Sequence, residues 1–272
     1  MVPLLIAANV VLLILLLAAV CLLNKYSRKL YGRRLFLSRL NKIPCVPLDE
    51  VDPAFRTGTF GATTDAEVHF IGGPVFAGPD PHETWILAAL ARGARQMFEF
   101  GTCTGRTTYL WARNSPRQAR VATLTLDSSD LEAYEADPGD SARDTRIALR
   151  ESCCDRFFYS DTSVEHKVEQ LYGDSKRFDE TPYVDACDLV FVDGSHAYSY
   201  VANDSQKALR MVRPGGLVLW HDYRDGGRPA GVVHFLNELA RELPLRRIQG
   251  TSLVYYRRPL EFAERIPFAR AA

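Results

Sequence analysis

The sequence has no surplus of either charge and no cysteine pattern that marks a metal or disulfide site. In its 272 residues, 33 lysine and arginine side chains balance 33 aspartates and glutamates. A general nucleic-acid-binding surface normally needs an excess of positive charge, so no nucleic-acid partner is expected. The six cysteines form no Cys-x-x-Cys pair and no zinc-finger spacing with histidine. This argues against a disulfide scaffold and favours a reducing compartment.

Residues 2–23, VPLLIAANVVLLILLLAAVCLL, contain no charged side chain, and Asn9 is their one strongly polar residue. As a helix, this run is long enough to cross the ~30 Å hydrocarbon core of a bilayer. A cleaved signal peptide is the alternative, but no lysine or arginine precedes the run and it exceeds the usual apolar core of such peptides. We therefore predict an uncleaved transmembrane anchor over residues 1–24.

Basic residues follow the apolar run directly, and they are Lys25, Arg28, Lys29, Arg33 and Arg34. Because basic residues concentrate on the cytoplasmic side of a span, they predict a single-pass protein with its large C-terminal part in the cytoplasm. Contact with anionic lipid head groups is a second interpretation of the same residues.

Beyond the anchor, the predicted organisation is a basic segment and irregular linker or cap at 25–80, a compact domain at 81–258 and a tail at 259–272. Buried strand patterns alternate with helical patterns through the domain, and 245–258 resembles an antiparallel pair that turns at Gly250. The strands are expected at 96–102, 121–127, 168–174, 187–194 and 216–222, and the helices at 83–94, 107–114, 199–212 and 232–244. This α/β alternation predicts a doubly wound, mostly parallel, Rossmann-like sheet with its ligand site at the carboxyl ends of the strands.

The loop after the first strand of this domain, FEFGTCTG at 98–105, is not a dinucleotide fingerprint. That fingerprint is G-x-G-x-x-G, and here Cys103 stands where its second glycine would be. Glu99 would repel a phosphate but suits an ammonium group. The loop thus favours a ligand with an amino-acid end and a nucleoside end, and a nicotinamide-dependent oxidoreductase remains a second interpretation.

With its acid-x-Gly-x-x-x-Gly spacing, the loop resembles the first motif of class I S-adenosylmethionine-dependent methyltransferases. The resemblance implies that Glu99 orients the methionine part, that Asp127 accepts the ribose hydroxyls and that Asp174 reaches the adenine amino group. The cofactor-binding residues implied in this way are Glu99, Gly101, Thr102, Gly105, Asp127, Asp174 and Asp193.

Two further segments, FVDGSHAY at 191–198 and RPGGLVLWHDY at 213–223, resemble a subgroup of these enzymes. It is the O-methyltransferase group of macrocin-type enzymes, with catechol-type enzymes as more distant relatives, and the resemblance spans about residues 80–257. It implies Asp193 and Asp222 as ligands of Mg²⁺, which would lower the pKa of an acceptor hydroxyl. His196 is then the expected general base.

One departure from this group concerns the metal. Several metal-dependent sugar enzymes have two consecutive acids where this chain has His221 and Asp222, and imidazole is a poor magnesium ligand. A metal-free mechanism with His196 or His221 as the base therefore stays open. Asp204, two helical turns after His196, is expected to face solvent.

The predicted function is O-methylation of a hydroxylated small molecule, a sugar or a secondary metabolite, at the cytoplasmic face of a membrane. A non-catalytic membrane scaffold with a nucleoside pocket is the remaining alternative. The acidic insert at 128–144 is expected as a solvated loop, with a cover for the active site as its other interpretation. The sequence carries no signal for the oligomeric state.

Overall fold

The structure, a computed structural model, describes residues 43–71, 79–227 and 229–260. The predicted anchor and the basic segment after it lie outside the described residues. Within those three ranges, no helix combines the length and the apolarity that a bilayer crossing requires. The anchor and the orientation inferred from it therefore stay predictions.

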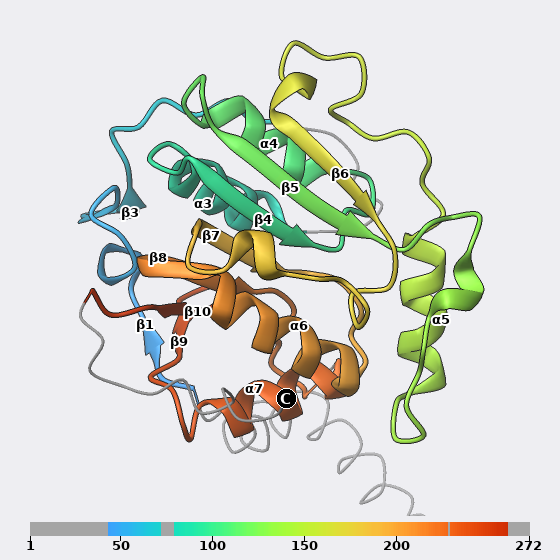
Figure 1. Cartoon of the computed structure of the whole chain (residues 1–272). Helices are drawn as coiled ribbons and strands as arrows, with labels where there is room; N and C mark the ends of the chain where they lie inside the picture. Colours follow the sequence, from blue (N-terminus) through green and yellow to red (C-terminus); the bar gives the residue numbers. More distant parts are fainter. Residues whose placement is uncertain (1–42, 72–78, 228, 261–272) are drawn as a thin grey trace, which may run out of the picture. The chain divides into compact units, whose positions relative to one another are not determined.

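One eight-stranded sheet, in the order β1-β9-β10-β8-β7-β4-β5-β6, forms the centre of the described chain (Figure 1). Its strands are β1 (Cys45–Val46), β4 (Gln96–Phe100), β5 (Arg120–Thr125), β6 (Val168–Tyr172), β7 (Cys187–Val192), β8 (Val212–Trp220), β9 (Arg246–Ile248) and β10 (Val254–Arg257). Strands β4 to β8 are parallel, whereas β10 runs antiparallel to both β8 and β9. The predicted mostly parallel, Rossmann-like sheet with a C-terminal antiparallel pair is confirmed.

Helices cover both faces of this sheet. The α-helices of the described chain are α3 (Pro81–Ala91), α4 (Arg106–Asn114), α5 (Ala142–Glu151), α6 (Tyr198–Met211) and α7 (Ala230–Leu239), and its short 3-10 turns are η2 (Leu48–Glu50), η3 (Leu131–Ala133), η4 (Glu165–Lys167) and η5 (Thr181–Tyr183). Met97 packs in one apolar core with α3 and α4, and the next residue, Phe98, packs in the other core with α6 and α7. This alternation is the period of a strand buried on both faces.

Helix α3 begins where the sequence supplies a complete N-terminal cap. The Asp80 side chain accepts hydrogen bonds from the backbone N–H groups of His82 and Glu83, and the Glu83 side chain accepts one from Asp80 N. Pro81 occupies the first helical position, where its missing N–H is not needed. The capping box fixes the place of Glu83, which also takes part in the site described below.

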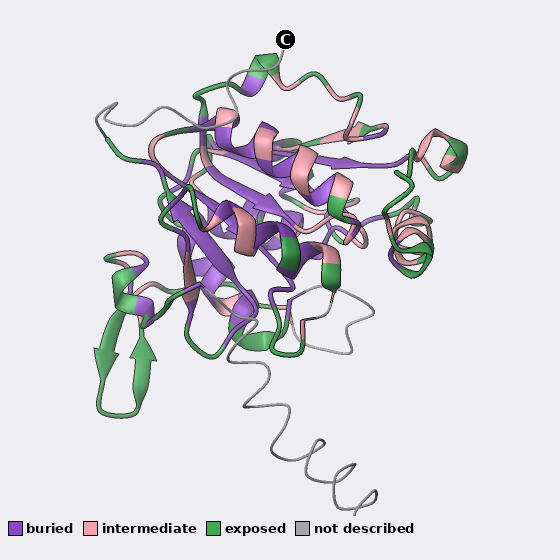
Figure 2. Cartoon of the chain, turned by 90° about the horizontal axis from the view of Figure 1, so that it is seen from below, coloured by how far each residue is buried: buried purple, intermediate pink, exposed green. Residues whose placement is uncertain are grey.

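The segment expected as an irregular linker contributes to the sheet. Strand β1 pairs in parallel with β9, and Val46, Leu48, Val51 and Phe55 are buried in the core shared with α3. The compact unit therefore includes the described residues from Ile43 onward, which the predicted boundary at residue 81 leaves out. After it, β2 (Arg56–Gly58) and β3 (Gly61–Thr63) form an exposed ribbon, drawn in green in Figure 2.

The acidic insert is also more ordered than a solvated loop. It contains η3, and its end forms the N-terminus of α5, where the Ser141 hydroxyl accepts a hydrogen bond from Arg143 N. The sequence analysis did not predict α5, whose only buried residue in the structure is Asp144.

Candidate active site

An open cavity of about 560 Å³ lies at the carboxyl ends of β4, β5, β6 and β7. The strand order reverses here, since the chain runs outward from β4 through β5 to β6 and then returns to β7 on the other side of β4. Open α/β sheets bind ligands at such a switch point. The cavity lies where the sequence placed the ligand.

The glycine loop needs both of its glycines, for different reasons. Gly101 lines the cavity with a φ of +99°, and a Cβ there would lie 2.3 Å from the carbonyl oxygen of Asp193. Gly105 caps α4 with a φ of +72°, and a Cβ there would lie 2.8 Å from the side chains of Phe157 and Tyr159. Gly101 thus allows close approach at the cavity, whereas Gly105 allows packing behind it.

Glu99 does not offer a charged carboxylate to the cavity, contrary to the expectation. It is 1% exposed and accepts hydrogen bonds from the hydroxyl groups of Thr108 and Thr123. Burial raises its pKa to about 8, so the carboxyl group is mostly protonated at neutral pH. Thr102 belongs to the same buried network through Thr123, at 2.8 Å between the two hydroxyl oxygens. Among the described residues that line the cavity, neither Glu99 nor Thr102 appears.

The two aspartates expected to hold the nucleoside differ in their placement. Asp174 is buried and lines the cavity, and its carboxylate accepts hydrogen bonds from Tyr200 Oη at 3.0 Å and from Lys176 N at 2.9 Å. Asp127 follows the cavity residue Leu126, but its Oδ1 accepts from the N–H and hydroxyl of Ser129, which lower its pKa. Of the two, the structure brings only Asp174 to the cavity.

Several residues at the cavity were not expected there. Asp204 is buried and not solvent-facing, and burial raises its pKa to about 6. Its spacing of four from Tyr200, which also lines the cavity, was the available sequence signal. Tyr134 comes from the acidic insert, stacks on Tyr200 at 4.3 Å between ring centroids, and lies 2.8 Å from Ser195 through its hydroxyl group. Part of the insert therefore lines the cavity, together with Ala148, Glu151 and Ser152.

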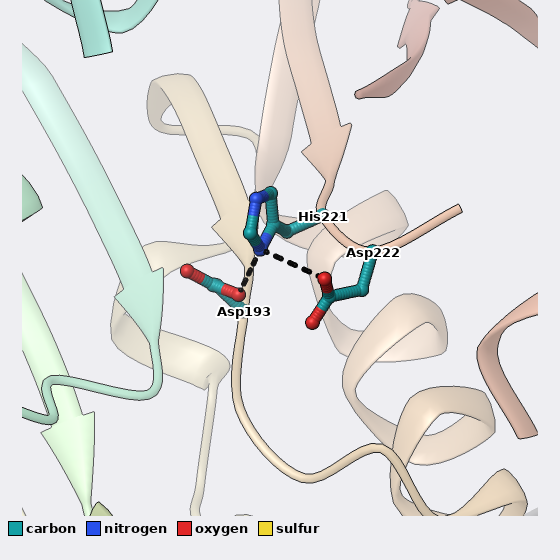
Figure 3. Close-up of side chains that lie close together, drawn as sticks. All are labelled: Asp193, His221 and Asp222. Atoms are coloured by element: carbon teal, nitrogen blue, oxygen red, sulfur yellow. Dashed lines mark hydrogen bonds and ion pairs between the residues drawn. The ribbon is translucent and has the colours of Figure 1, made fainter. Parts of the chain in front are cut away.

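Beside the cavity, the ends of β7 and β8 bring Asp193, His221 and Asp222 together (Figure 3). His221 Nδ1 lies 2.9 Å from Asp193 Oδ1 and 3.6 Å from Asp222 Oδ1. On the other side of the ring, Nε2 lies 3.0 Å from Glu83 Oε2. Burial alone would lower the pKa of His221, but the contacts with Asp193 and Glu83 outweigh it and hold the pKa well above its usual value. With a carboxylate on each nitrogen, His221 has no free lone pair and is not a general base, which corrects that prediction.

His196 pairs with the same aspartate from another direction. Its Nε2 lies 2.7 Å from Asp222 Oδ2, and Arg224 Nη2 lies 2.5 Å from Asp222 Oδ1. Burial lowers the pKa of His196, but the hydrogen bond and charge of Asp222 outweigh this and raise it. The second ring nitrogen, Nδ1, is buried and has no hydrogen-bond partner among the described residues. His196 therefore keeps one nitrogen available for chemistry.

Magnesium does not fit this arrangement. Asp193, His221 and Asp222 each present one potential ligand atom, all within 4.8 Å of one another. Mg²⁺ requires oxygen ligands in near-ideal octahedral geometry, and here the third donor is an imidazole with both nitrogens held by carboxylates. Asp222 is in addition engaged by His196 and Arg224.

Glu83 is the cluster residue that sequence reasoning missed. It lies on α3, outside the motifs at the strand ends, and its other oxygen accepts hydrogen bonds from the backbone N–H and the hydroxyl of Ser252. The contact with His221 lowers its pKa to about 2, although burial acts in the opposite direction. The capping box fixes its place on the helix, but no sequence pattern linked it to His221.

Comparison with known proteins shows what this part of the chain is similar to. Residues 98–223 match a family model described as a methyltransferase domain. No protein with a curated description matches the chain. Among solved structures, the chain resembles the O-methyltransferase TomG from Streptomyces achromogenes, crystallised with S-adenosylmethionine, at 22% identity over 66% of this chain and 81% of that one, with a TM-score of 0.46.

A second similar structure is an O-methyltransferase from Bacillus cereus in complex with S-adenosylhomocysteine. It is 17% identical over 66% of this chain and 82% of that one, with a TM-score of 0.42. The family match favours methyl transfer over the nicotinamide-dependent and scaffold interpretations. The matched residues, 98–223, contain both the glycine loop and Asp193, His196, His221 and Asp222, so the cavity and the cluster beside it lie in the part of the chain that is similar to a methyltransferase domain.

Proposed function

We propose that this enzyme transfers the methyl group of S-adenosylmethionine to a hydroxyl oxygen of a small molecule, with His196 as the general base. The observation that carries the proposal is the 2.7 Å contact between His196 Nε2 and Asp222 Oδ2, which leaves Nδ1 with no partner among the described residues. A small hollow borders His196 and shares Asp193, Gly194 and Ser195 with the larger cavity. An acceptor there would lie beside the cofactor.

The described residues support a simple proton path. S-adenosylmethionine supplies a methyl group activated by its sulfonium sulfur. Asp222 accepts the Nε2–H of neutral His196 and so fixes the tautomer with a lone pair on Nδ1. Nδ1 takes the proton of the acceptor hydroxyl as its oxygen forms a bond to the methyl carbon and the carbon–sulfur bond breaks. Asp222 then stabilises the imidazolium that results.

Two parts of the cavity suit this cofactor. Gly101 allows a ligand to approach the loop backbone closely, and Asp174, at the end of β6, presents a buried carboxylate for an amino group. We assign the methionine part to the Gly101 side and the adenine to the Asp174 side. Magnesium has no step in this mechanism, because the donor set does not suit it.

The proposed acceptor is a hydroxylated sugar or secondary metabolite that the enzyme meets at the cytoplasmic face of a membrane. The support is the uncharged run at 2–23 followed by five basic residues, as in a single-pass anchor. The apolar run would hold the domain close to acceptors that partition into or are made at the bilayer.

The test compares His196→Asn with a matched control, His234→Asn, whose side chain is 69% exposed on α7 and pairs with Glu238. Calorimetry with S-adenosylhomocysteine reports cofactor binding, and methyl transfer from labelled S-adenosylmethionine to catechols, sugars and phenols reports activity. We expect His196→Asn to bind the cofactor product normally and to lose roughly 10²- to 10⁴-fold in kcat, as for loss of a general base. An unchanged kcat would refute the role of His196. Failure of the wild-type protein to bind S-adenosylhomocysteine would refute the cofactor assignment.

A further inference from the structure

The His221 ring lies among three carboxylates, which is unusual for a neutral imidazole. Asp193 faces Nδ1 at 2.9 Å, Glu83 faces Nε2 at 3.0 Å, and Asp222 lies 3.6 Å from Nδ1. The ring and Glu83 are both almost completely buried, with side-chain exposures of 3% and 4%. Water therefore contributes little to the solvation of these charges.

Hydrogen counting decides the form of the ring. A neutral imidazole has one N–H donor and one lone pair, so one of the two close carboxylates would face a lone pair at hydrogen-bond distance. Two acceptors at such a distance repel each other, and the repulsion is strong where burial excludes solvent. With both carboxyl groups ionised, as the lowered pKa of Glu83 indicates for that group, the two short contacts require a ring that donates from both nitrogens.

Positively charged side chains contact the carboxylates of the cluster. Glu83, Asp193 and Asp222 contribute three carboxylates. The cations in contact with them are His221 itself, His196 when it is protonated, and Arg224 at 2.5 Å from Asp222. Buried carboxylates require such partners, and in metal-dependent sites a divalent cation supplies the charge. In this chain the side chains supply it.

We propose that the His221 ring takes the place of a divalent cation between Asp193 and Asp222, so that this enzyme holds its acceptor site together without a bound metal. His221 acts as a positioning residue: it fixes the carboxylate of Asp193 at the border of the small hollow and the larger cavity. The inference rests on the proposed function only where it speaks of an acceptor. It also implies that this single residue excludes the metal, because Asp193 and Asp222 already offer hard oxygen ligands.

The test is the substitution His221→Asp in the full chain, with His221→Asn as the matched control. Both variants remove the ring, but only His221→Asp adds a third carboxylate to Asp193 and Asp222. We expect both to unfold at a lower temperature than wild type in EDTA. Only His221→Asp should recover with MgCl₂, in a saturable way, by roughly 5–10 °C at a concentration a hundred times its Kd. NaCl at equal ionic strength controls for screening.

Metal titrations of the wild-type protein test the proposal without relying on either variant. Its Tm and its S-adenosylhomocysteine affinity should be the same in EDTA, MgCl₂ and MnCl₂, and calorimetry should detect no saturable binding of either metal. Saturable binding of Mg²⁺ or Mn²⁺ by wild type would overturn the proposal even if His221→Asp failed to fold. If His221→Asp folded but its Tm did not increase with MgCl₂, the claim that this residue alone excludes the metal would be overturned. Loss of S-adenosylhomocysteine binding by wild type would count against the proposed function and leave the metal titrations interpretable.

Discussion

Replacing Gly101 by alanine should weaken cofactor binding through the backbone and not through a lost contact. The new Cβ would lie 2.3 Å from the carbonyl oxygen of Asp193, whereas ordinary van der Waals contact begins at 3.4 Å, so the backbone of one strand end must move by 1.1 Å. The φ of +99° adds strain of about 1–3 kcal/mol for a residue with a side chain. If the bound loop must keep this conformation, affinity falls by at least roughly 5- to 150-fold.

The assay is calorimetric titration with S-adenosylhomocysteine, combined with thermal unfolding to verify that the variant folds. Gly93→Ala is the matched control, since a Cβ there meets nothing within 4 Å. The control should bind like wild type. If Gly101→Ala bound the ligand within twofold of wild type, with an unchanged Tm, the loop would not be the cofactor site that we describe.

Four further predictions concern protonation and the insert. Only neutral His196 accepts a proton, and its pKa is raised, so kcat should increase with pH through a midpoint above the usual ~6.5. Asp222→Asn should lower that midpoint. A midpoint below ~6.5 in wild type would contradict the role of His196. Glu99→Gln should bind S-adenosylhomocysteine within about twofold of wild type at pH 7, because the carboxyl group is already protonated, and a tenfold loss would restore the charged-carboxylate hypothesis. The folded-state pKa of Glu99 is raised, so the Tm of wild type relative to Glu99→Gln should fall as pH increases from 4.5 towards 8. Tyr134→Ala removes the stack on Tyr200 and should raise the dissociation rate of S-adenosylhomocysteine by roughly 2- to 10-fold in stopped-flow measurements. Tyr134→Phe keeps the stack and is the control. Equal dissociation rates in wild type and Tyr134→Ala would show that the insert does not retain the ligand.

The sequence by itself determined the central strands, four of the five described α-helices and the edge of the sheet at which the larger cavity lies. These features depend on local signals: apolar runs of strand length, amphipathic periods, and glycines at positions with positive φ such as Gly101. It also identified the segments that contain His196 and Asp222, because polar residues at parallel strand ends converge on one edge.

Only the tertiary structure decided how these residues work. Strand β1 has two residues, too few for a periodic signal, and joins the sheet by pairing with β9, about 200 positions later in the chain. The neutral state of Glu99 follows from complete burial, which its sequence neighbours do not reveal. The contact between Glu83 and His221 spans 138 positions. Protonation and metal preference depend on solvation and on such distant charges, and both exist only once the chain is folded.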